Sequence, residues 1–294
     1  MRRAILYYLC SVLFFTLNAI AQSGTKITIL YDSFGKRPSL TQDWGYAALV
    51  EYAGKRILFD TGNDAEIFAR NVRTMGVDLR KLDLVVISHR HADHTSGLTY
   101  LLQVNPKVRI YVPHEPFGLF GGDPPQNLYR DVEVLPAEYR YFNGVHKKFK
   151  TGTPWPAANF VQVESSQEIG PGIILVESIS QTPGTLELRE LTLRLETPSG
   201  AIIVTGCSHS GIEKILQASV DFKSAHIRTV VGGLHLVKTS DEDIRQIVSN
   251  LQNHWRLDEI APGHCTGEPA VAMLRNAFQS RFRYAGLGEV VSFP

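Results

Sequence analysis

The spacing of apolar residues along the chain predicts a mixture of strands and helices. Short runs that alternate or stay apolar are typical of strands, and apolar residues three and four positions apart are typical of amphipathic helices. The expected strands are 26–31, 46–52, 56–59, 82–87, 108–112, 173–176, 186–196, 201–204, 227–231 and 257–260. The expected helices are 65–75, 95–104, 212–218, 241–254 and 268–278. Strands dominate the first part and strand–helix alternation follows in both halves, which predicts two packed sheets with helices outside.

The segment from 114 to about 170 interrupts this pattern. It combines the pairs Gly121-Gly122 and Pro124-Pro125 with many aromatic residues, and it shows no helical or strand period. A connection of this length is typical of a binding loop or lid, or of an excursion without fixed structure. We therefore expect one domain over 22–294, with an insertion at about 114–170 that covers a substrate cleft if it folds over the body.

Composition and charge exclude several classes of protein. Of the 294 residues, 44% are hydrophobic and 20% are charged, which is typical of a globular chain rather than a disordered one. Lys and Arg number 30 against 29 Asp and Glu, and the net charge is +1. This balance predicts no nucleic-acid partner, because binding to phosphates normally requires a basic excess. Ten His beside three Cys and three Met is the unusual feature of the composition.

The first 21 residues have the three-part layout of a secretory signal peptide. Arg2 and Arg3 precede an uncharged stretch over 4–17, and Ala19-Ile20-Ala21 offers small residues to a signal peptidase. Because a membrane-spanning helix needs about 20 apolar residues, we expect cleavage and no stable membrane span afterwards. The sequence therefore predicts an exported protein, periplasmic or secreted. Its remaining cysteines, Cys207 and Cys265, could form a disulfide or act as thiols in a site.

Three of the ten His lie together in the segment that follows the expected strand 82–87. This segment reads His89-Arg90-His91-Ala92-Asp93-His94. Alternation at the end of a strand places His89 and His91 on one side, while Asp93 and His94 fall where the chain turns into the next helix. Imidazole and carboxylate groups are ligands of Zn²⁺ and similar cations. Two clusters of such ligands that lie close together suit a two-metal hydrolytic centre. The alternative is a set of solvated loop His.

Three motifs resemble those of the metallo-β-lactamase superfamily, and the resemblance extends over roughly residues 25–292. They are Leu58-Phe59-Asp60-Thr61-Gly62, the segment 89–94, and Ala261-Pro262-Gly263-His264. The resemblance implies an α/β (α+β) fold, the four-layer αββα sandwich. It also implies a dinuclear centre of divalent metal ions, zinc foremost, with Mn or Fe as alternatives. The implied ligands are His89 and His91 at one metal and Asp93, His94 and His264 at the other, with Asp60 supporting the site from behind.

Two further motifs depart from the commonest pattern of the superfamily. Where many members have TPGH, this chain has Thr182-Pro183-Gly184-Thr185, and where many have TGD, it has Thr205-Gly206-Cys207. The third ligand of the first metal and the bridging Asp are therefore not in their usual places. His209 could supply the missing imidazole, and the thiolate of Cys207 is an alternative ligand.

Three segments resemble one branch of the superfamily in particular. They are the segments 206–212, which reads GCSHSGI, 232–236, which reads GGLHL, and 263–267, which reads GHCTG. That branch is named for dihydropterin-ribofuranosylaminobenzene phosphate synthase and contains many hydrolase-like proteins. The resemblance implies that His209, His235 and His264 lie near the metal centre.

These observations favour a metal-dependent hydrolase that cleaves an ester, lactone, amide or phosphoester of a small molecule. Two cations lower the pKa of a water molecule and polarise the bond to be cleaved, and Asp93 could orient that water as the catalytic residue. His114, directly after the expected strand 108–112, is a candidate substrate contact. The alternatives are a synthase-type group transfer, a redox metal site, against which the intact signature argues, and a non-catalytic exported metal-binding protein.

Overall fold

The computed structural model describes residues 24–115, 118–122, 133–145, 150–181 and 187–294. The expected signal peptide and the 182–185 turn lie outside these residues. The described strands form two mixed sheets, in the orders β13-β1-β2-β3-β4-β5-β6 and β12-β11-β10-β9-β8-β7. The first contains β1 (Thr25–Tyr31), β2 (Ala47–Tyr52), β3 (Lys55–Phe59), β4 (Leu84–Val86), β5 (Arg109–Pro113), β6 (Asn159–Val163) and β13 (Val290–Phe293). The second contains β7 (Gln167–Gly170), β8 (Ile173–Ser180), β9 (Leu188–Thr197), β10 (Gly200–Thr205), β11 (Ile227–Gly233) and β12 (Glu259–Gly263).

The main core lies between the two sheets. Because successive side chains of a strand point to opposite faces, each strand sends alternate apolar residues inward. Ile27 and Phe59 of the first sheet belong to the same fully buried cluster as Leu193 and Val231 of the second. Burial of a side chain of this size contributes about 1.5–3 kcal/mol. The sheet pair therefore forms a rigid frame for the loops at its edge.

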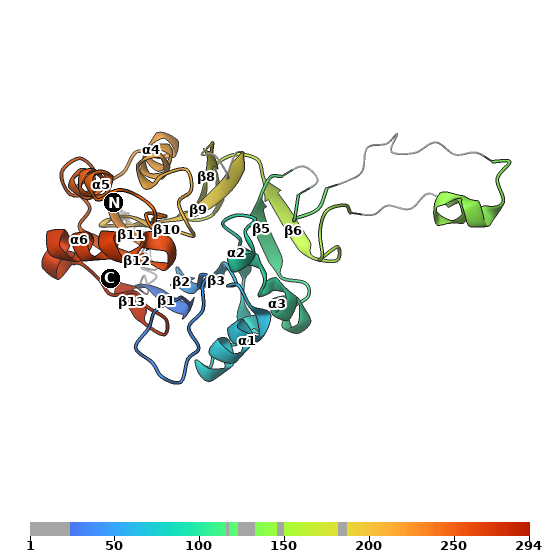
Figure 1. The fold of residues 1–294 in the computed structure, drawn as a ribbon, viewed down its shortest axis with the longest axis horizontal. Coiled ribbons are helices and arrows are strands. Elements are labelled where there is room, and N and C mark those ends of the chain that lie inside the picture. Colours follow the sequence, from blue (N-terminus) through green and yellow to red (C-terminus); the bar gives the residue numbers. More distant parts are fainter. Residues whose placement is uncertain (1–23, 116–117, 123–132, 146–149, 182–186) are drawn as a thin grey trace, which may run out of the picture.

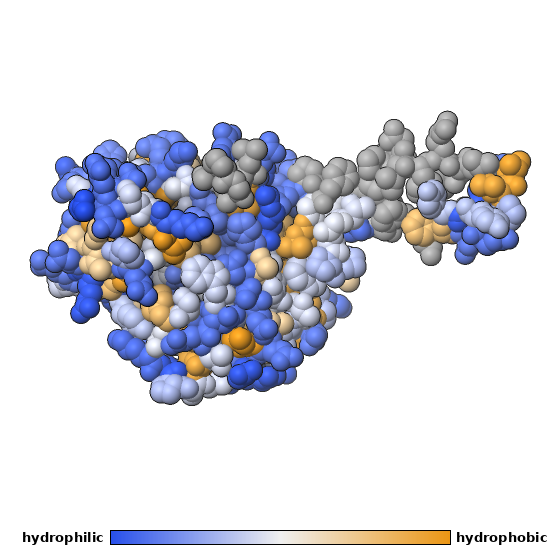
Figure 2. Space-filling view, viewed as in Figure 1, coloured by the Kyte–Doolittle hydropathy of each residue, from blue (hydrophilic) through white to orange (hydrophobic). Residues whose placement is uncertain are grey.

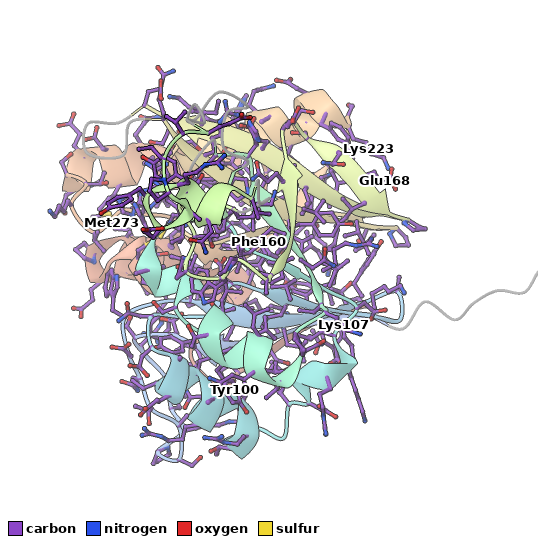
Figure 3. All side chains as sticks on the ribbon, turned by 90° about the vertical axis from the view of Figure 1, so that its right-hand side faces the viewer. Tyr100, Lys107, Phe160, Glu168, Lys223 and Met273 are labelled. Atoms are coloured by element: carbon purple, nitrogen blue, oxygen red, sulfur yellow. The ribbon has the colours of Figure 1, made fainter. Side chains whose placement is uncertain are left out.

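Helices cover the outer face of each sheet, as Figure 1 shows. On the first sheet lie α1 (Ala65–Thr74), α2 (Ala92–Thr95) and α3 (Leu98–Val104), and on the second lie α4 (Ile212–Phe222), α5 (Asp241–Asn253) and α6 (Glu268–Phe278). In Figure 3, Tyr100 of α3 and Lys223, which follows α4, lie on opposite sides of the molecule. The arrangement is the four-layer αββα sandwich, which confirms the predicted fold.

The helix that the sequence predicts over 95–104 is divided into two. Gly97 separates α2 from α3, and a Cβ atom there would lie 2.1 Å from the carbonyl oxygen of Thr61. Only glycine allows the chain to cross so closely over the turn that follows β3. This crossing brings the start of α2 against the end of β3.

The hydrophobic pattern does not predict β6, β7 and β13. Each is an edge strand: β6 pairs in parallel with β5, β7 pairs with β8, and β13 pairs with β1. Edge strands are short and partly solvated, so they carry few of the buried positions that produce a strand period. The segment 114–170 thus contains two sheet strands. The connection between β5 and β6 runs from 114 to 158.

Part of this connection projects away from the sandwich. Two short 3₁₀ turns, η2 (Ala137–Tyr139) and η3 (Tyr141–Gly144), lie well apart from the sheets in Figure 1. Figure 2 shows the same segment as an extension of the surface. Apolar side chains on it are exposed, with Val134 at 90%. The described residues 133–145 therefore lie away from the sandwich, whereas Phe120 is buried against the first sheet and its helices, and the expected lid stays a prediction.

Within the described ranges, no helix is long and apolar enough to cross a bilayer.

Candidate metal centre

The segment 89–94 begins in the loop after β4 and ends within α2, which contains Asp93 and His94. His89 and His94 are fully buried, and their ring centroids lie 4.2 Å apart. His91 is next to them, with its Nδ1 3.1 Å from Nε2 of His89. Asp93 is partly exposed, and its Oδ2 lies 3.5 Å from Nε2 of His94. The four side chains that the sequence singles out here therefore lie together in space.

Asp60 supports this loop from behind. It follows β3 with a φ of 59°, and its two oxygens accept hydrogen bonds from the backbone N–H and the hydroxyl of Ser88, each at 2.7 Å. The same carboxylate lies 2.7 Å from Nδ1 of His94. This contact directs Nε2 of His94 toward Asp93 and Cys207. Burial lowers the pKa of His94, but the carboxylates of Asp60 and Asp93 more than offset burial and raise it to about 10.

The second sheet supplies the other side of the cluster. Its contributions are Cys207 and His209 after β10, His235 after β11, and His264 after β12. These three strands are parallel, so their carboxyl ends and the loops that follow meet at one edge of the sheet. Nε2 of His264 lies 3.4 Å from Oδ2 of Asp93. The ring centroids of His209 and His89 are 4.9 Å apart, so the two sides form one cluster.

Two buried carboxylates that the sequence analysis misses hold these loops in place. Glu190 in β9 accepts hydrogen bonds from the backbone N–H groups of His209 and Ser210, both at 2.8 Å. Asp32, directly after β1, accepts one from the N–H of His264 at 3.0 Å. Burial raises the pKa of both carboxyls, that of Asp32 to about 7. An acid within or just after a buried strand is the signal that could have found them, because buried carboxylates are rare without partners.

Three sets of side chains bring possible ligand atoms within 4.8 Å of one another. They are Asp93, His94, Cys207 and His264; His89, Cys207 and His209; and Cys207, His235 and Cys265. The first set contains the three ligands that the resemblance implies at one metal, the second contains His89 but not His91, and Cys207 belongs to both sets. His91 adjoins the second set, since its ring centroid lies 4.8 Å from that of His209. His235 is exposed and groups with the two thiols rather than with a carboxylate.

The donor set fits divalent cations. The ring nitrogens of His209 and His264 are buried and form no hydrogen bond with any residue of the described ranges. A buried polar atom in this condition costs about 1–3 kcal/mol unless a ligand satisfies it. Burial lowers the pKa of His209 to about 3, so its imidazole is neutral, which is the form that binds metal ions. Imidazole, carboxylate and thiolate are together the ligands that zinc takes in proteins.

Cys207 and Cys265 are both buried and both free thiols. The Sγ atom of Cys265 lies 3.6 Å from the carbonyl oxygen of Cys207. Burial raises the pKa of the Cys207 thiol well above its usual value. Of the two alternatives left open by the sequence, the structure therefore has the thiols rather than the disulfide.

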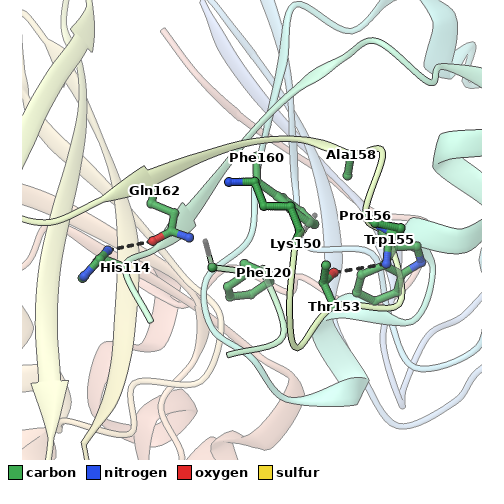
Figure 4. A pocket seen from close by; sticks show the side chains of 10 residues that line it. His114, Phe120, Lys150, Thr153, Trp155, Pro156, Ala158, Phe160 and Gln162 are labelled. Atoms are coloured by element: carbon green, nitrogen blue, oxygen red, sulfur yellow. Dashed lines mark hydrogen bonds between the residues drawn. The ribbon is translucent and has the colours of Figure 1, made fainter. Parts of the chain in front are cut away.

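The cluster opens into a cavity, and the predicted contact His114 lies in a different one. The cavity at the cluster measures about 460 Å³ and is lined by Trp44, Asp93 and His264, among others. His114 lines a separate cavity of about 390 Å³ beside β6, where its Nδ1 lies 2.7 Å from the side-chain oxygen of Gln162 (Figure 4). The two cavities share no lining residue among those described.

Comparison with known proteins agrees with this geometry. A 7,8-dihydropterin-6-methyl-4-(beta-D-ribofuranosyl)-aminobenzene-5'-phosphate synthase of Methanocaldococcus jannaschii is 27% identical over 295 residues, or 90% of this chain and 95% of the relative. The crystal structure of a metal-dependent hydrolase of the β-lactamase superfamily is 26% identical, with a TM-score of 0.68 over 91% of this chain and 98% of that chain.

A ribonuclease Z of Clostridium kluyveri is 34% identical over 56 residues, or 19% of this chain and 18% of its own length. The absence of a nucleic-acid partner therefore stays a prediction.

The sequence profile of the metallo-β-lactamase superfamily matches residues 41–211, more than half of the chain. This protein belongs to the metallo-β-lactamase superfamily.

Proposed function

We propose that this chain is a metal-dependent hydrolase that cleaves an ester, lactone, amide or phosphoester of a small molecule. One observation carries the proposal: imidazole, carboxylate and thiol groups from both sheets converge within 4.8 Å at one edge of the sandwich. Membership in a superfamily that usually binds divalent metals supports it. In this proposal the centre holds two divalent cations, zinc foremost.

The proposed roles follow from the positions of the side chains. His89, His91 and His209 would hold one cation, and Asp93, His94 and His264 the other. Asp60 fixes the orientation of His94, and a partner of this kind sets the tautomer of a ligating imidazole. When bound, divalent cations supply Lewis-acid activation of a water molecule and of the bond to be cleaved.

Asp93 is also the proposed catalytic carboxylate. Its side chain is 18% exposed, whereas those of His94 and His264 are 0% exposed. It lines the cavity into which the cluster opens. A carboxylate in this position can orient the attacking water, take a proton from it as it attacks, and later deliver that proton to the leaving group.

A larger cavity beside the cluster supports a small-molecule substrate. It measures about 950 Å³ and shares Trp44 and His264 with the cavity at the cluster. Its lining includes the aromatic residues Phe34, Trp44, Phe282 and Tyr284 and the cations Lys36 and Arg275. Glu268 is the acid among the described lining residues. A substrate with an aromatic or apolar group and a negative charge would fit this lining.

A group-transfer reaction is the second candidate function. The observation in its favour is the synthase of Methanocaldococcus jannaschii, which matches this chain over 90% of its length. A transferase of this fold would pass the activated group to a second substrate instead of water.

Export, either to the periplasm or to the medium, is proposed on the residue order of 1–21 alone. The N-terminal mass of the protein recovered from each cell fraction would test it.

Metal analysis of the purified protein, combined with a substrate panel, tests the proposed function. The panel contains carboxylic esters, lactones, amides and phosphoesters, each with a neutral and an anionic aromatic member. We expect about two metal ions per chain and hydrolysis that a chelator abolishes. Bound metal with no hydrolysis of any member would favour a non-catalytic metal-binding protein. A joined product after addition of an amine or alcohol acceptor would favour the transferase.

A further inference from the structure

We propose that the thiolate of Cys207 bridges the two cations of the metal centre, in the position where the commonest pattern of the superfamily has a carboxylate. The inference rests on the proposed function, because it presupposes two bound cations. It concerns a residue of this chain, and it can be tested without a substrate.

The position of the sulfur carries the argument. Sγ of Cys207 belongs to the set that contains Asp93 and to the set that contains His89. It lies 3.2 Å from Nε2 of His94. Among the described residues, no other side chain belongs to more than one of the sets. A bridging ligand must lie within reach of both cations, and an atom that belongs to two sets meets this requirement.

The imidazoles on either side of the sulfur give an independent indication of bound cations. His264 belongs to one set and His209 to the other. As whole residues they are only 5% and 8% exposed, and within the described part of the chain the ring nitrogens of His209 have no hydrogen-bond partner, while Nε2 of His264 faces the carboxylate of Asp93 at 3.4 Å. One set therefore contains a buried imidazole that lacks a partner, the other contains an imidazole that converges with a carboxylate, and Cys207 lies in both sets.

The backbone leaves the sulfur little freedom to lie elsewhere. A Cβ atom on Gly206 would be 2.2 Å from the hydroxyl of Ser88, and one on Gly233 would be 2.3 Å from the carbonyl oxygen of Gly206. Ser208 has a φ of 68°, and its hydroxyl donates a hydrogen bond to the carbonyl of Gly233 at 2.7 Å. Cys207 is thus in a turn fixed between the two sheets, where it is 3% exposed.

Cys265 is the competing thiol. It shares the third set with Cys207 and His235, but it belongs neither to the set with Asp93 nor to the set with His89. Its sulfur lies 3.6 Å from the backbone carbonyl of Cys207. The geometry therefore places Cys265 beside the bridge and not within it.

Formation of the bridge is a ligand exchange without oxidation. The thiol of Cys207 loses its proton to solvent, and the sulfur donates one electron pair to each cation. Since a thiolate is a softer ligand than a carboxylate, the bridge favours Zn²⁺, Co²⁺ or Fe²⁺ over Mg²⁺ and Mn²⁺.

X-ray absorption at the zinc edge of the full chain, loaded with Zn²⁺, counts the sulfur neighbours of each ion. A thiolate shared by two zinc ions gives about one sulfur neighbour per zinc at about 2.3 Å. One thiolate on each ion would give the same count, and Cys265→Ser separates the two cases because it would halve the count only in the second. A thiolate on one of two ions gives about half a neighbour per zinc, and a centre without sulfur gives none. We expect the first result, and either of the other two overturns the proposal.

Two variants identify the sulfur. Cys207→Asp supplies a carboxylate instead, so we expect about two zinc ions per chain and loss of the sulfur neighbour. The matched control, Cys265→Ser, should keep both the zinc content and the sulfur neighbour. The opposite pattern would assign the thiolate to Cys265 and contradict the proposal. If Cys207→Asp does not fold, the spectrum of the wild-type protein and that of Cys265→Ser still decide.

The failure of this inference is distinguishable from the failure of the proposed function. A protein with about one sulfur neighbour per zinc that hydrolyses no panel member would contradict the hydrolase and leave the bridge standing. A hydrolytically active zinc protein without a sulfur neighbour would support the hydrolase and contradict the bridge.

Discussion

The two sides of the metal-binding cluster are built in different ways. On the side of the first sheet, the clustered side chains come from one continuous segment, 89–94, in the loop after β4 and the start of α2. On the side of the second sheet, they come from three separate loops after β10, β11 and β12. The first side is visible in the sequence as a single motif. The second side exists because parallel strands bring distant residues to one edge.

The two sides also differ in what orients their imidazoles. Nδ1 of His89 lies 2.8 Å from the hydroxyl of Ser88, and Nδ1 of His94 lies 2.7 Å from the carboxylate of Asp60. His209 and His264 are held through their backbone N–H groups, whereas the ring of His209 has no hydrogen-bond partner among the described residues and Nε2 of His264 faces Asp93 of the first side at 3.4 Å. The first side is therefore oriented before a metal binds, and the rings of the second side depend on the metal.

Asp93→Ala should produce the largest effect, because Asp93 joins the two sides. Its Oδ2 lies 3.5 Å from Nε2 of His94 and 3.4 Å from Nε2 of His264. We expect the loss of at least one metal ion per chain and a decrease in kcat/KM of more than about 100-fold, a larger loss than removal of a supporting partner causes. Metal analysis and kinetics on the best panel substrate measure both.

Asp258→Ala is the matched control for this variant. Asp258 also pairs with a histidine, His226, at 3.1 Å, but both side chains are exposed at the surface. Metal content and activity should stay at the wild-type level. Full activity in Asp93→Ala would refute the role assigned to Asp93.

Removal of the metal should loosen the second side more than the first. With metal at about 1,000 times its dissociation constant, binding adds about 4 kcal/mol to the free energy of unfolding, and a chelator removes this contribution. Hydrogen exchange with and without the chelator locates the effect. We expect the chelator to increase the exchange rate more in 207–211 and 263–266 than in 88–94. Equal acceleration of all three segments would show that both sides depend on the metal to the same extent.

Asp60→Asn should weaken metal binding by about 10- to 100-fold, because it removes the charged partner that orients His94. Asparagine keeps the size of the side chain and one oxygen that can accept from Ser88. Its amide group can no longer offer a carboxylate to Nδ1 of His94. Competition with a chromophoric chelator measures the zinc affinity. An unchanged affinity would mean that the first side is not oriented by its hydrogen bonds.

Most of the central strands and outer helices could be predicted, because their burial produces a regular apolar period. The inner strand β10, for example, is buried at every position after its first, whereas the edge strand β6 is buried only at its last residue, Val163. β6 and β7 are edge strands with few buried positions, so they do not carry a readable pattern, whereas β13 alternates but has only four residues. The division between α2 and α3 depends on the close approach of Gly97 to another loop, which local sequence does not reveal.

The residues of the cluster and its supports were predictable where they form motifs, and the supports outside those motifs were not. Asp60 belongs to a motif and is found where the resemblance implies. Asp32 and Glu190 act through backbone N–H groups that are 232 and 19 positions away in the sequence. A bond to a distant backbone group leaves no residue pattern at either end. His114, a histidine at the end of a strand, lies in a cavity separate from the cluster, and its role as a substrate contact stays a prediction.

Glu190→Gln should produce the smallest effect, and it tests whether the backbone contacts of the second side orient its ligands. Glutamine keeps the shape and one acceptor oxygen, but it sets an amide N–H₂ against the backbone N–H of His209 or Ser210. The loss of one hydrogen bond to a charged group lowers the free energy of unfolding by about 1.5–3 kcal/mol, which denaturant unfolding of the metal-free protein measures. Zinc affinity should fall by about 10-fold at most, less than in Asp60→Asn, because the metal itself orients the His209 ring. An equal loss of zinc affinity in the two variants would mean that the backbone contact orients His209 as fully as Asp60 orients His94. The two sides would then differ only in whether their ligands come from one segment or from several loops.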